Sequence, residues 1–227
     1  MFDRLLNQQG GPRWTRLITY RVLEGVFPQQ LNACDGYIVT GSAAGVYEDH
    51  SWMDPLMGFI RKAHNANIPL LGICFGHQAI AQALGGEVVK WPDGWGVGVR
   101  PTHFLRRPTE TANLPEDAIV HLIYFHQDQV TRLPEAAERL ASSDFCDVAG
   151  FYLTSQDGTQ NVLCLQGHPE FDADYSTALL DAIKDKVGAA LTAEAQASLA
   201  QKTDSLLVAG WIKQFFTTAA LRRGRAV

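Results

Sequence analysis

The 227-residue sequence lacks several features that define common classes of protein. Its 19 Lys and Arg residues are outnumbered by 24 Asp and Glu residues, and the net charge is −5, so we expect no nucleic-acid partner. No apolar run approaches the roughly 18 residues of a membrane span, and the first residues do not resemble a secretion signal. We therefore expect no membrane partner and a cytoplasmic location.

Cysteine is scarce and dispersed. Cys34, Cys74, Cys146 and Cys164 form no Cys-x-x-Cys pair, which argues against a zinc site and against a thioredoxin-like redox pair. The sequence also has no internal repeat and no glycine-rich P-loop, so nothing indicates a nucleotide-binding synthetase domain. We expect one domain over residues 1–227, no metal, no cofactor, and three cysteines that serve only as core residues.

One stretch combines a buried strand, a sharp turn and an apolar helix. Leu70–Ile73 is short and apolar, as in a strand covered on both faces, and helical spacing begins after Cys74. Gly72 and Gly76 flank the cysteine, so the backbone can turn tightly, much as in a nucleophile elbow. The positive end of the following helix favours a thiolate. The sequence thus predicts a reactive cysteine at the tip of this turn.

A cysteine nucleophile needs a base and a group that orients the base. His168 and Glu170 stand two residues apart at a predicted strand end, and Pro169 between them favours an extended turn in which they share a hydrogen bond. An isolated His-Pro-Glu is more often structural. Together with the Gly-x-Cys-x-Gly turn it indicates an acid/base pair for Cys74.

Acyl transfer also needs donors for an oxyanion. The backbone N–H of Phe75 is the natural first donor. The second is Gly41 or Ser42, in a glycine-bounded loop that follows the predicted strand 36–40. Taken alone, that loop is more often a simple turn.

The remaining patterns predict a sheet with antiparallel additions, followed by helices. Strands are expected at 16–22, 87–90, 97–105, 118–125, 148–153 and 161–165, with a hairpin turn at 156–159. Helices are expected at 1–9, 51–67, 173–188, 192–202 and 204–221. The predicted fold is α/β, a mostly parallel sheet with helices on both faces and C-terminal helices over 172–221.

These motifs resemble those of class I glutamine amidotransferases, in the stand-alone branch similar to the amidotransferase domain of GMP synthetase. Gly72-Ile73-Cys74-Phe75-Gly76-His77-Gln78 matches the nucleophile motif, His168-Pro169-Glu170 the His-x-Glu motif, and Gly41-Ser42 the oxyanion loop. The resemblance implies a flavodoxin-like fold in which Cys74 attacks the side-chain amide of glutamine, a glutamyl thioester forms, and ammonia leaves.

The resemblance also implies substrate contacts. Gln78 is expected to contact the bound glutamine, and the segment with His126, Gln127 and Asp128 is similar to the one whose backbone holds the substrate's α-amino and carboxylate groups. His126 itself is expected to be structural, and His77 to order the turn. The acceptor of ammonia is either a synthetase subunit on another chain or water.

Two alternatives stay open, and one departure from the family stands out. The first alternative is a γ-glutamyl peptidase or γ-glutamyl-amine hydrolase, and the second is a non-catalytic regulatory or binding module. The departure is at the N-terminus, where the chain starts at what should be the first helix and the first family strand is apparently missing. If it is absent, we expect an empty sheet position and an exposed strand edge.

Overall fold

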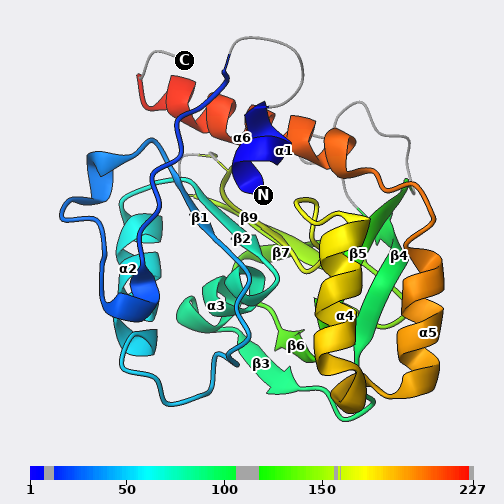
Figure 1. Ribbon diagram of the computed structural model, residues 1–227. Helices are drawn as coiled ribbons and strands as arrows, with labels where there is room; N and C mark the ends of the chain where they lie inside the picture. The colour runs from blue at the N-terminus through cyan, green and yellow to red at the C-terminus, as the bar shows by residue number, and fades with distance from the viewer. Residues whose placement is uncertain (8–12, 106–117, 156–157, 159, 225–227) are drawn as a thin grey trace.

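The computed structural model describes residues 1–7, 13–105, 118–155, 158 and 160–224 (Figure 1). Its helices are α1 (Phe2–Asn7), α2 (Met53–Asn65), α3 (Phe75–Ala83), α4 (Ala173–Val187), α5 (Ala189–Ser198) and α6 (Ser205–Arg222). Its strands are β1 (Tyr37–Val39), β2 (Leu70–Ile73), β3 (Glu87–Lys90), β4 (Gly96–Phe104), β5 (Ile119–His126), β6 (Asp128–Arg132), β7 (Ala137–Ser142), β8 (Gly150–Thr154) and β9 (Gln160–Leu165).

Within the described residues, seven strands form one continuous sheet in the order β1-β2-β9-β8-β7-β4-β5. The parallel part is β1-β2-β9, and the strands from β9 to β5 pair antiparallel. β3 and β6 form a separate antiparallel pair. The α/β fold with helices on both faces and antiparallel additions is therefore confirmed, and the parallel pairing of the sheet lies at β1-β2 and β2-β9.

The side chains of β2 alternate between two cores. Leu71 and Ile73 join a cluster with α1 and α6, whereas Leu70 joins a cluster with α2 and α3. Because the side chains of a strand point alternately to opposite faces, this strand must be apolar throughout when helices cover both faces. All four of its residues are buried, as the sequence predicted.

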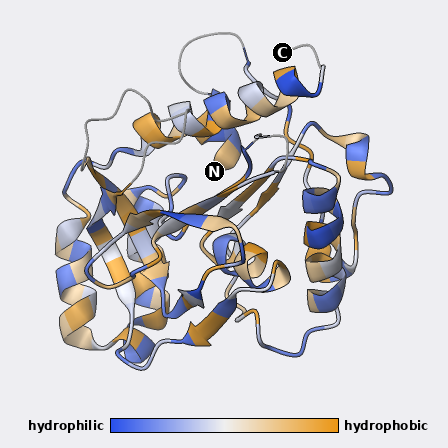
Figure 2. Cartoon of the chain, turned by 180° about the vertical axis from the view of Figure 1, so that it is seen from behind, coloured by the Kyte–Doolittle hydropathy of each residue, from blue (hydrophilic) through white to orange (hydrophobic). Residues whose placement is uncertain are grey.

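The helices cover the sheet in three places. α6 crosses one face together with α1, and α4 and α5 lie beside β4 and β5 (Figure 1). On the opposite face, α2 directs one stripe inward, formed by Met53, Leu56, Met57, Ile60 and Ala63. Figure 2 shows hydrophilic and hydrophobic bands alternating along this helix, as an amphipathic helix requires. None of the described helices has the length and apolar content needed to cross a membrane.

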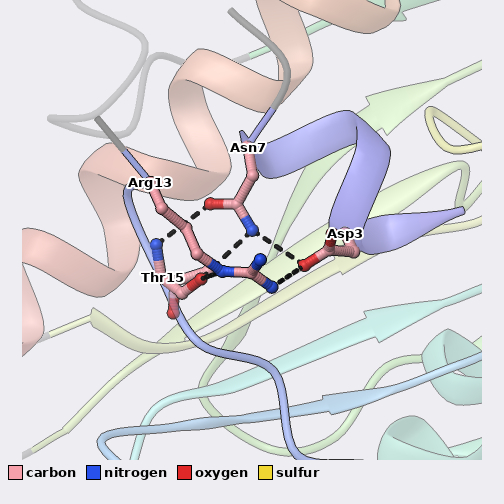
Figure 3. Close-up of polar contacts among 4 residues, drawn as sticks. All are labelled: Asp3, Asn7, Arg13 and Thr15. Atoms are coloured by element: carbon pink, nitrogen blue, oxygen red, sulfur yellow. Dashed lines mark hydrogen bonds and ion pairs between the residues drawn. The ribbon is translucent and has the colours of Figure 1, made fainter. Parts of the chain in front are cut away.

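The N-terminal helix is tied to the chain that follows it. Asn7 Nδ2 donates to Asp3 Oδ1 (2.9 Å) and to the carbonyl of Thr15 (3.1 Å), and the N–H of Thr15 donates to Asn7 Oδ1 (3.0 Å). Arg13 pairs with Asp3 (Figure 3). These contacts hold residues 13–15 beside α1.

One predicted strand is wrong, and two observed strands, β6 and β7, were not predicted. Residues 16–21 form no strand, because no other described segment pairs with them in a ladder, and Val22–Glu24 is a short 3₁₀ turn. The alternating pattern instead reflects side chains such as Tyr20, which pack against the α2 side of the core. The sequence of β7 shows little alternation of apolar and polar residues, and the segment is a strand because it pairs with β8.

The other predicted elements are found with bounds shifted by up to four residues. In the predicted turn 156–159, residues 156, 157 and 159 lie outside the described residues, as do residues 8–9 of the predicted first helix. β1 forms one end of the seven-stranded sheet. The expectation that the first strand of the family is missing stays a prediction.

Candidate active site

Cys74 occupies a strained turn between β2 and α3. Its backbone has φ 53° and ψ −105°, a conformation that costs a non-glycine residue roughly 1–3 kcal/mol. The neighbouring glycines make the turn possible: a Cβ on Gly76 would lie 1.9 Å from the carbonyl oxygen of Val39, and one on Gly72 would lie 2.6 Å from that of Gly76. The Cys74 N–H donates to the carbonyl of Leu165 (2.9 Å), so the turn is anchored to β9.

His168 and Glu170 form a buried pair just after β9. The Nδ1 of His168 lies 2.8 Å from Glu170 Oε1, and each side chain is 3% exposed. Since a carboxylate only accepts, Nδ1 carries the proton and Nε2 is left for another partner. The N–H of His168 donates to the carbonyl of Ile123 (2.8 Å), and the Phe171 ring stacks on the imidazole with 3.7 Å between ring centroids.

The structure brings Cys74 and this pair together. Burial lowers the pKa of His168, but the charge and hydrogen bond of Cys74 and those of Glu170 outweigh it, and the pKa is raised to about 10. A protonated imidazole between two anions is stabilised even without water. The predicted nucleophile, base and orienting carboxylate therefore share one buried site.

The predicted oxyanion residues lie beside the same groups. A Cβ on Gly41 would be 3.1 Å from His168 Cε1 and 4.0 Å from Cys74 Cβ, so the glycine loop passes close to both. The Ser42 hydroxyl accepts from the N–H of Ala44 (3.2 Å), which shapes the loop. Phe75 is the first residue of α3, where backbone N–H groups lack helical partners.

The side chains of Gln78 and His126 bond to the backbone carbonyl of Asp128. Gln78 Nε2 donates to the Asp128 carbonyl (3.0 Å) and to Gln166 Oε1 (3.1 Å), so both amide protons have acceptors inside the protein. His126 Nδ1 donates to the same carbonyl (2.9 Å). In this structure the two side chains position the expected substrate-binding segment.

The other residues of that segment have partners across the site. Gln127 Nε2 donates to the carbonyl of Trp91 (3.1 Å). The Asp128 carboxylate accepts from the Tyr47 hydroxyl (2.9 Å), and burial raises the pKa of this carboxyl. Sequence reasoning missed Tyr47, because no local pattern connects it with a residue 81 positions away. It also gave no role to Gln166, or to Phe171 next to the His-x-Glu motif.

The other buried histidines are neutral. Burial lowers the pKa of His77 to about 3 and that of His126 to about 4. His77 packs against the Phe151 ring, with 5.1 Å between ring centroids. Both placements agree with the structural roles expected for these residues.

The four cysteines are free thiols. Burial raises the pKa of Cys146 to about 12 and that of Cys164 well above its ordinary value, so both are inert core groups. Cys34 is half-buried, with its sulfur 3.9 Å from the Tyr20 hydroxyl. Among the described residues, no group of His, Cys, Asp and Glu side chains could hold a metal ion.

The fold and this site define a class of protein: an α/β protein with a cysteine thiol on a strand-to-helix turn at the carboxyl ends of parallel strands, where such sheets place their active sites. The chain belongs to the class-I glutamine amidotransferases, whose family model matches residues 18–181. It is a glutamine amidotransferase-like hydrolase.

Individual relatives agree with this family. The chain is 34% identical over 194 residues to γ-glutamyl peptidase 4 of Arabidopsis thaliana, covering 81% of this chain and 71% of the relative. It is 31% identical over 188 residues to a glutamine-hydrolysing GMP synthase of Cupriavidus taiwanensis, covering 75% of this chain and 33% of that one. The fold is similar to a glutamine amidotransferase structure from Thermotoga maritima, with a TM-score of 0.69, 20% identity, and coverage of 88% of this chain and 84% of the other.

Proposed function

We propose that Cys74 is the nucleophile, His168 the acid/base and Glu170 the orienting carboxylate in the hydrolysis of γ-glutamyl amides. The observation that carries this proposal is the buried 2.8 Å contact between His168 and Glu170 beside a cysteine held at φ 53°. A strained, preorganised cysteine next to a charged imidazole is an activated nucleophile.

The proposed reaction has two halves. His168 already holds the proton, because its pKa is raised to about 10, and the Cys74 thiolate beside it attacks the γ-carbonyl carbon to form a C–S bond and an oxyanion. His168 then gives the proton to the leaving nitrogen, the C–N bond breaks, and a glutamyl thioester remains. In the second half, neutral His168 takes a proton from water and the hydroxide attacks the thioester. The C–S bond then breaks, glutamate leaves, and the Cys74 thiolate stands again beside protonated His168.

The remaining site residues have supporting roles in this proposal. The N–H of Phe75 and an N–H of Gly41 or Ser42 stabilise the oxyanion, because they lie beside Cys74 on rigid or tightly turned backbone. The backbone at Gln127 and Asp128 binds the α-amino and carboxylate groups of the γ-glutamyl donor, and Gln78 and His126 hold that backbone in place.

The first candidate substrate is glutamine. Relatives named glutamine-hydrolysing GMP synthases support it. In this proposal the released ammonia passes to a partner synthetase subunit or is released into water. We propose a single hydrolase domain over 1–227 in the cytoplasm; four free thiols are what a reducing compartment favours.

The second candidate is a γ-glutamyl peptide or amine. It is favoured by relatives named γ-glutamyl peptidases, which align over 71% of their own length in the example above. The chemistry at Cys74 is the same, and only the leaving amine differs.

Steady-state kinetics would separate the two candidates. We would compare kcat/KM for glutamine, γ-glutamyl dipeptides and γ-glutamyl amines, each with and without cell extract to supply a partner. Glutamine turnover that exceeds the others, or that rises with extract, supports the amidotransferase. Glutamine turnover below that of a γ-glutamyl peptide or amine supports the peptidase.

A non-catalytic module is tested by covalent trapping. A glutamine-analogue electrophile should add one glutamyl-like group to Cys74 of the folded protein, detected by mass spectrometry of the intact chain and its peptides. Folded protein that stays unlabelled, and hydrolyses no γ-glutamyl compound, would make the binding module the better explanation.

A further inference from the structure

One hydrogen bond joins the glycine loop to the strand across the site. The Tyr47 hydroxyl donates to Asp128 Oδ1 at 2.9 Å, and Asp128 is the first residue of β6. We propose that this bond latches the glycine loop in place, so that Tyr47 and Asp128 are positioning residues for the oxyanion donors beside Cys74. The catalytic part of this inference rests on the proposed γ-glutamyl hydrolysis.

Asp128 is fixed relative to the nucleophile. Its carbonyl accepts from both Gln78 (3.0 Å) and His126 (2.9 Å). The N–H of Gln78 in turn donates to the carbonyl of Cys74 (3.1 Å), so these two residues share the first turn of α3. Asp128 is therefore an anchor that cannot move independently of the Cys74 turn.

The glycine loop is shaped so that Tyr47 reaches this anchor. The ring of Tyr47 folds back over Gly45: a Cβ on that glycine would lie 2.8 Å from Tyr47 Cζ and 3.0 Å from its hydroxyl oxygen. Val46 between them is buried in the α2 side of the core. The N–H of Glu48 donates to the carbonyl of Gly45 (3.1 Å), which closes the turn.

The contacts form a closed circuit around the nucleophile. The first turn of α3 joins Cys74 to Gln78, and the Gln78 side chain bonds to the Asp128 carbonyl. The Asp128 carboxylate bonds to Tyr47, and the loop leads from Tyr47 back to Gly41. There a Cβ would be only 4.0 Å from Cys74 Cβ. Exposed loops move more than the elements that they connect, whereas oxyanion donors act only when they are already in position. The latch removes that freedom.

The polar groups are suited to this role. Burial first, and then the hydrogen bond and charge of Asp128, raise the pKa of Tyr47, so its hydroxyl keeps the proton that it donates. The Asp128 carboxylate also lies near Lys90 and Glu48, whose opposite charges act on it. The Asp128 carboxylate acts only as the acceptor of the Tyr47 hydroxyl proton, and the amide oxygen of an asparagine at this position could accept the same proton.

Four variants test the latch. Tyr47→Phe removes the donor and keeps the ring, Gly45→Ala forces the ring aside, Asp128→Ala removes the acceptor, and Asp128→Asn keeps an acceptor oxygen without the charge. For the first three we expect kcat on a γ-glutamyl substrate to fall roughly tenfold to a hundredfold, with KM changed by less than about threefold, as for partial loss of an oxyanion donor. Asp128→Asn, in contrast to Asp128→Ala, should retain most of the wild-type kcat.

Combination and control variants sharpen the test. Gly45→Ala in the Tyr47→Phe background should cost little beyond Tyr47→Phe alone, because the bond is already lost. Gly58→Ala is the matched control, since its new Cβ would lie 4.0 Å from its nearest contact, Arg61. Alkylation of Cys74 by iodoacetamide needs no oxyanion donor and should proceed at the wild-type rate in every variant.

Amide hydrogen exchange measures the latch without catalysis. Peptides covering 40–47 should exchange faster in Tyr47→Phe and in Gly45→Ala than in the wild type and Gly58→Ala. Unchanged exchange, or unchanged kcat in Tyr47→Phe, would overturn the proposal. The proposal would also be overturned if Asp128→Asn lost activity while Tyr47→Phe kept it. That result would mean that the Asp128 carboxylate binds the ammonium group of the substrate. If the wild type hydrolyses no γ-glutamyl compound, the proposed function fails, and the exchange rates still decide whether the latch exists.

Discussion

His126 ends β5 and His168 follows β9 of the same sheet; they are 4% and 3% exposed, and their pKa values shift in opposite directions. Burial lowers both pKa values. At His168 the charges of Cys74 and Glu170 more than compensate, whereas His126 Nδ1 meets only the carbonyl of Asp128. Two equally buried imidazoles thus differ because of their partners. His168 is the imidazole that holds a proton beside Cys74, and His126 is a neutral imidazole that holds the Asp128 backbone.

The largest expected effect comes from removing the partner that acts most strongly on His168. Cys74→Ala should abolish turnover, a loss of roughly 10⁴-fold or more, because the thioester cannot form. It should also lower the pKa of His168, which NMR titration of the imidazole can follow. The melting temperature should hardly change.

Cys164→Ala is the matched control for this variant. Cys164 is buried on β9 in the α2 side of the core, so its loss should leave kcat intact and reduce stability by about 1 kcal/mol. A Cys74→Ala rate within a few-fold of the wild type would end the thioester mechanism.

Glu170→Gln should have the next largest effect. The variant keeps the shape of the side chain but loses the charge, so kcat should fall by roughly 10²- to 10⁴-fold, more than substrate binding weakens. With one anion gone, the pKa of His168 falls, and the alkaline limb of the kcat/KM profile should move to lower pH. An unmoved limb would mean that Glu170 does not stabilise the imidazolium.

The same pair predicts how stability depends on alkaline pH. A histidine whose pKa is raised in the native state stabilises it fully below the unfolded pKa, near 6.5, and this contribution is lost as the pH rises toward about 10. Urea unfolding between pH 7 and 10 should show this loss in the wild type and a smaller one in Glu170→Gln.

His126→Gln tests the other side of the comparison. The pKa of His126 is lowered to about 4 in the native state, so on acidification the imidazole is protonated in the unfolded chain before it is protonated in the native protein. The free energy of unfolding therefore falls as the pH drops from 6.5 toward 4. The slope is at most about 1.4 kcal/mol per pH unit for each such histidine. Urea unfolding at pH 5, 6 and 7 should give a shallower slope in the variant. An unchanged acid slope would show that His126 does not stay neutral in the native state.

Phe171→Leu should have the smallest effect. The ring stacks on the face of His168 at 3.7 Å, and losing such a contact costs about 0.5–1.5 kcal/mol. We expect kcat to fall a few-fold with little change in KM. Tyr175→Phe, which keeps the ring that packs on Phe171, is the control and should retain wild-type kinetics.

Local chemistry explains how much of the site could be predicted. Gly72 and Gly76 surround Cys74 because the turn leaves no room for a Cβ, and this requirement is visible in adjacent residues. His168 and Glu170 are also neighbours in sequence, so their hydrogen bond follows from short-range geometry. The fold class followed for the same reason, since the apolar run 70–73 reports burial on both faces.

Predictions failed where pairing between distant segments decides the structure. Residues 16–22 have the alternation of a strand, but none of the described strands pairs with them. Ala137–Ser142 lacks that pattern and becomes β7 because β8 lies beside it. A strand is stable only when its backbone groups find partners, and a local pattern cannot supply them.

The sequence by itself determined the candidate reactive groups, the tight turn at Cys74 and the buried character of β2, because each depends on residues within a few positions. Only the tertiary structure decided which imidazole has its pKa raised, what holds Asp128, and that the Tyr47 hydroxyl reaches the Asp128 carboxylate. Those outcomes depend on Coulomb interactions, hydrogen bonds and desolvation between segments that become neighbours only when the sheet is complete.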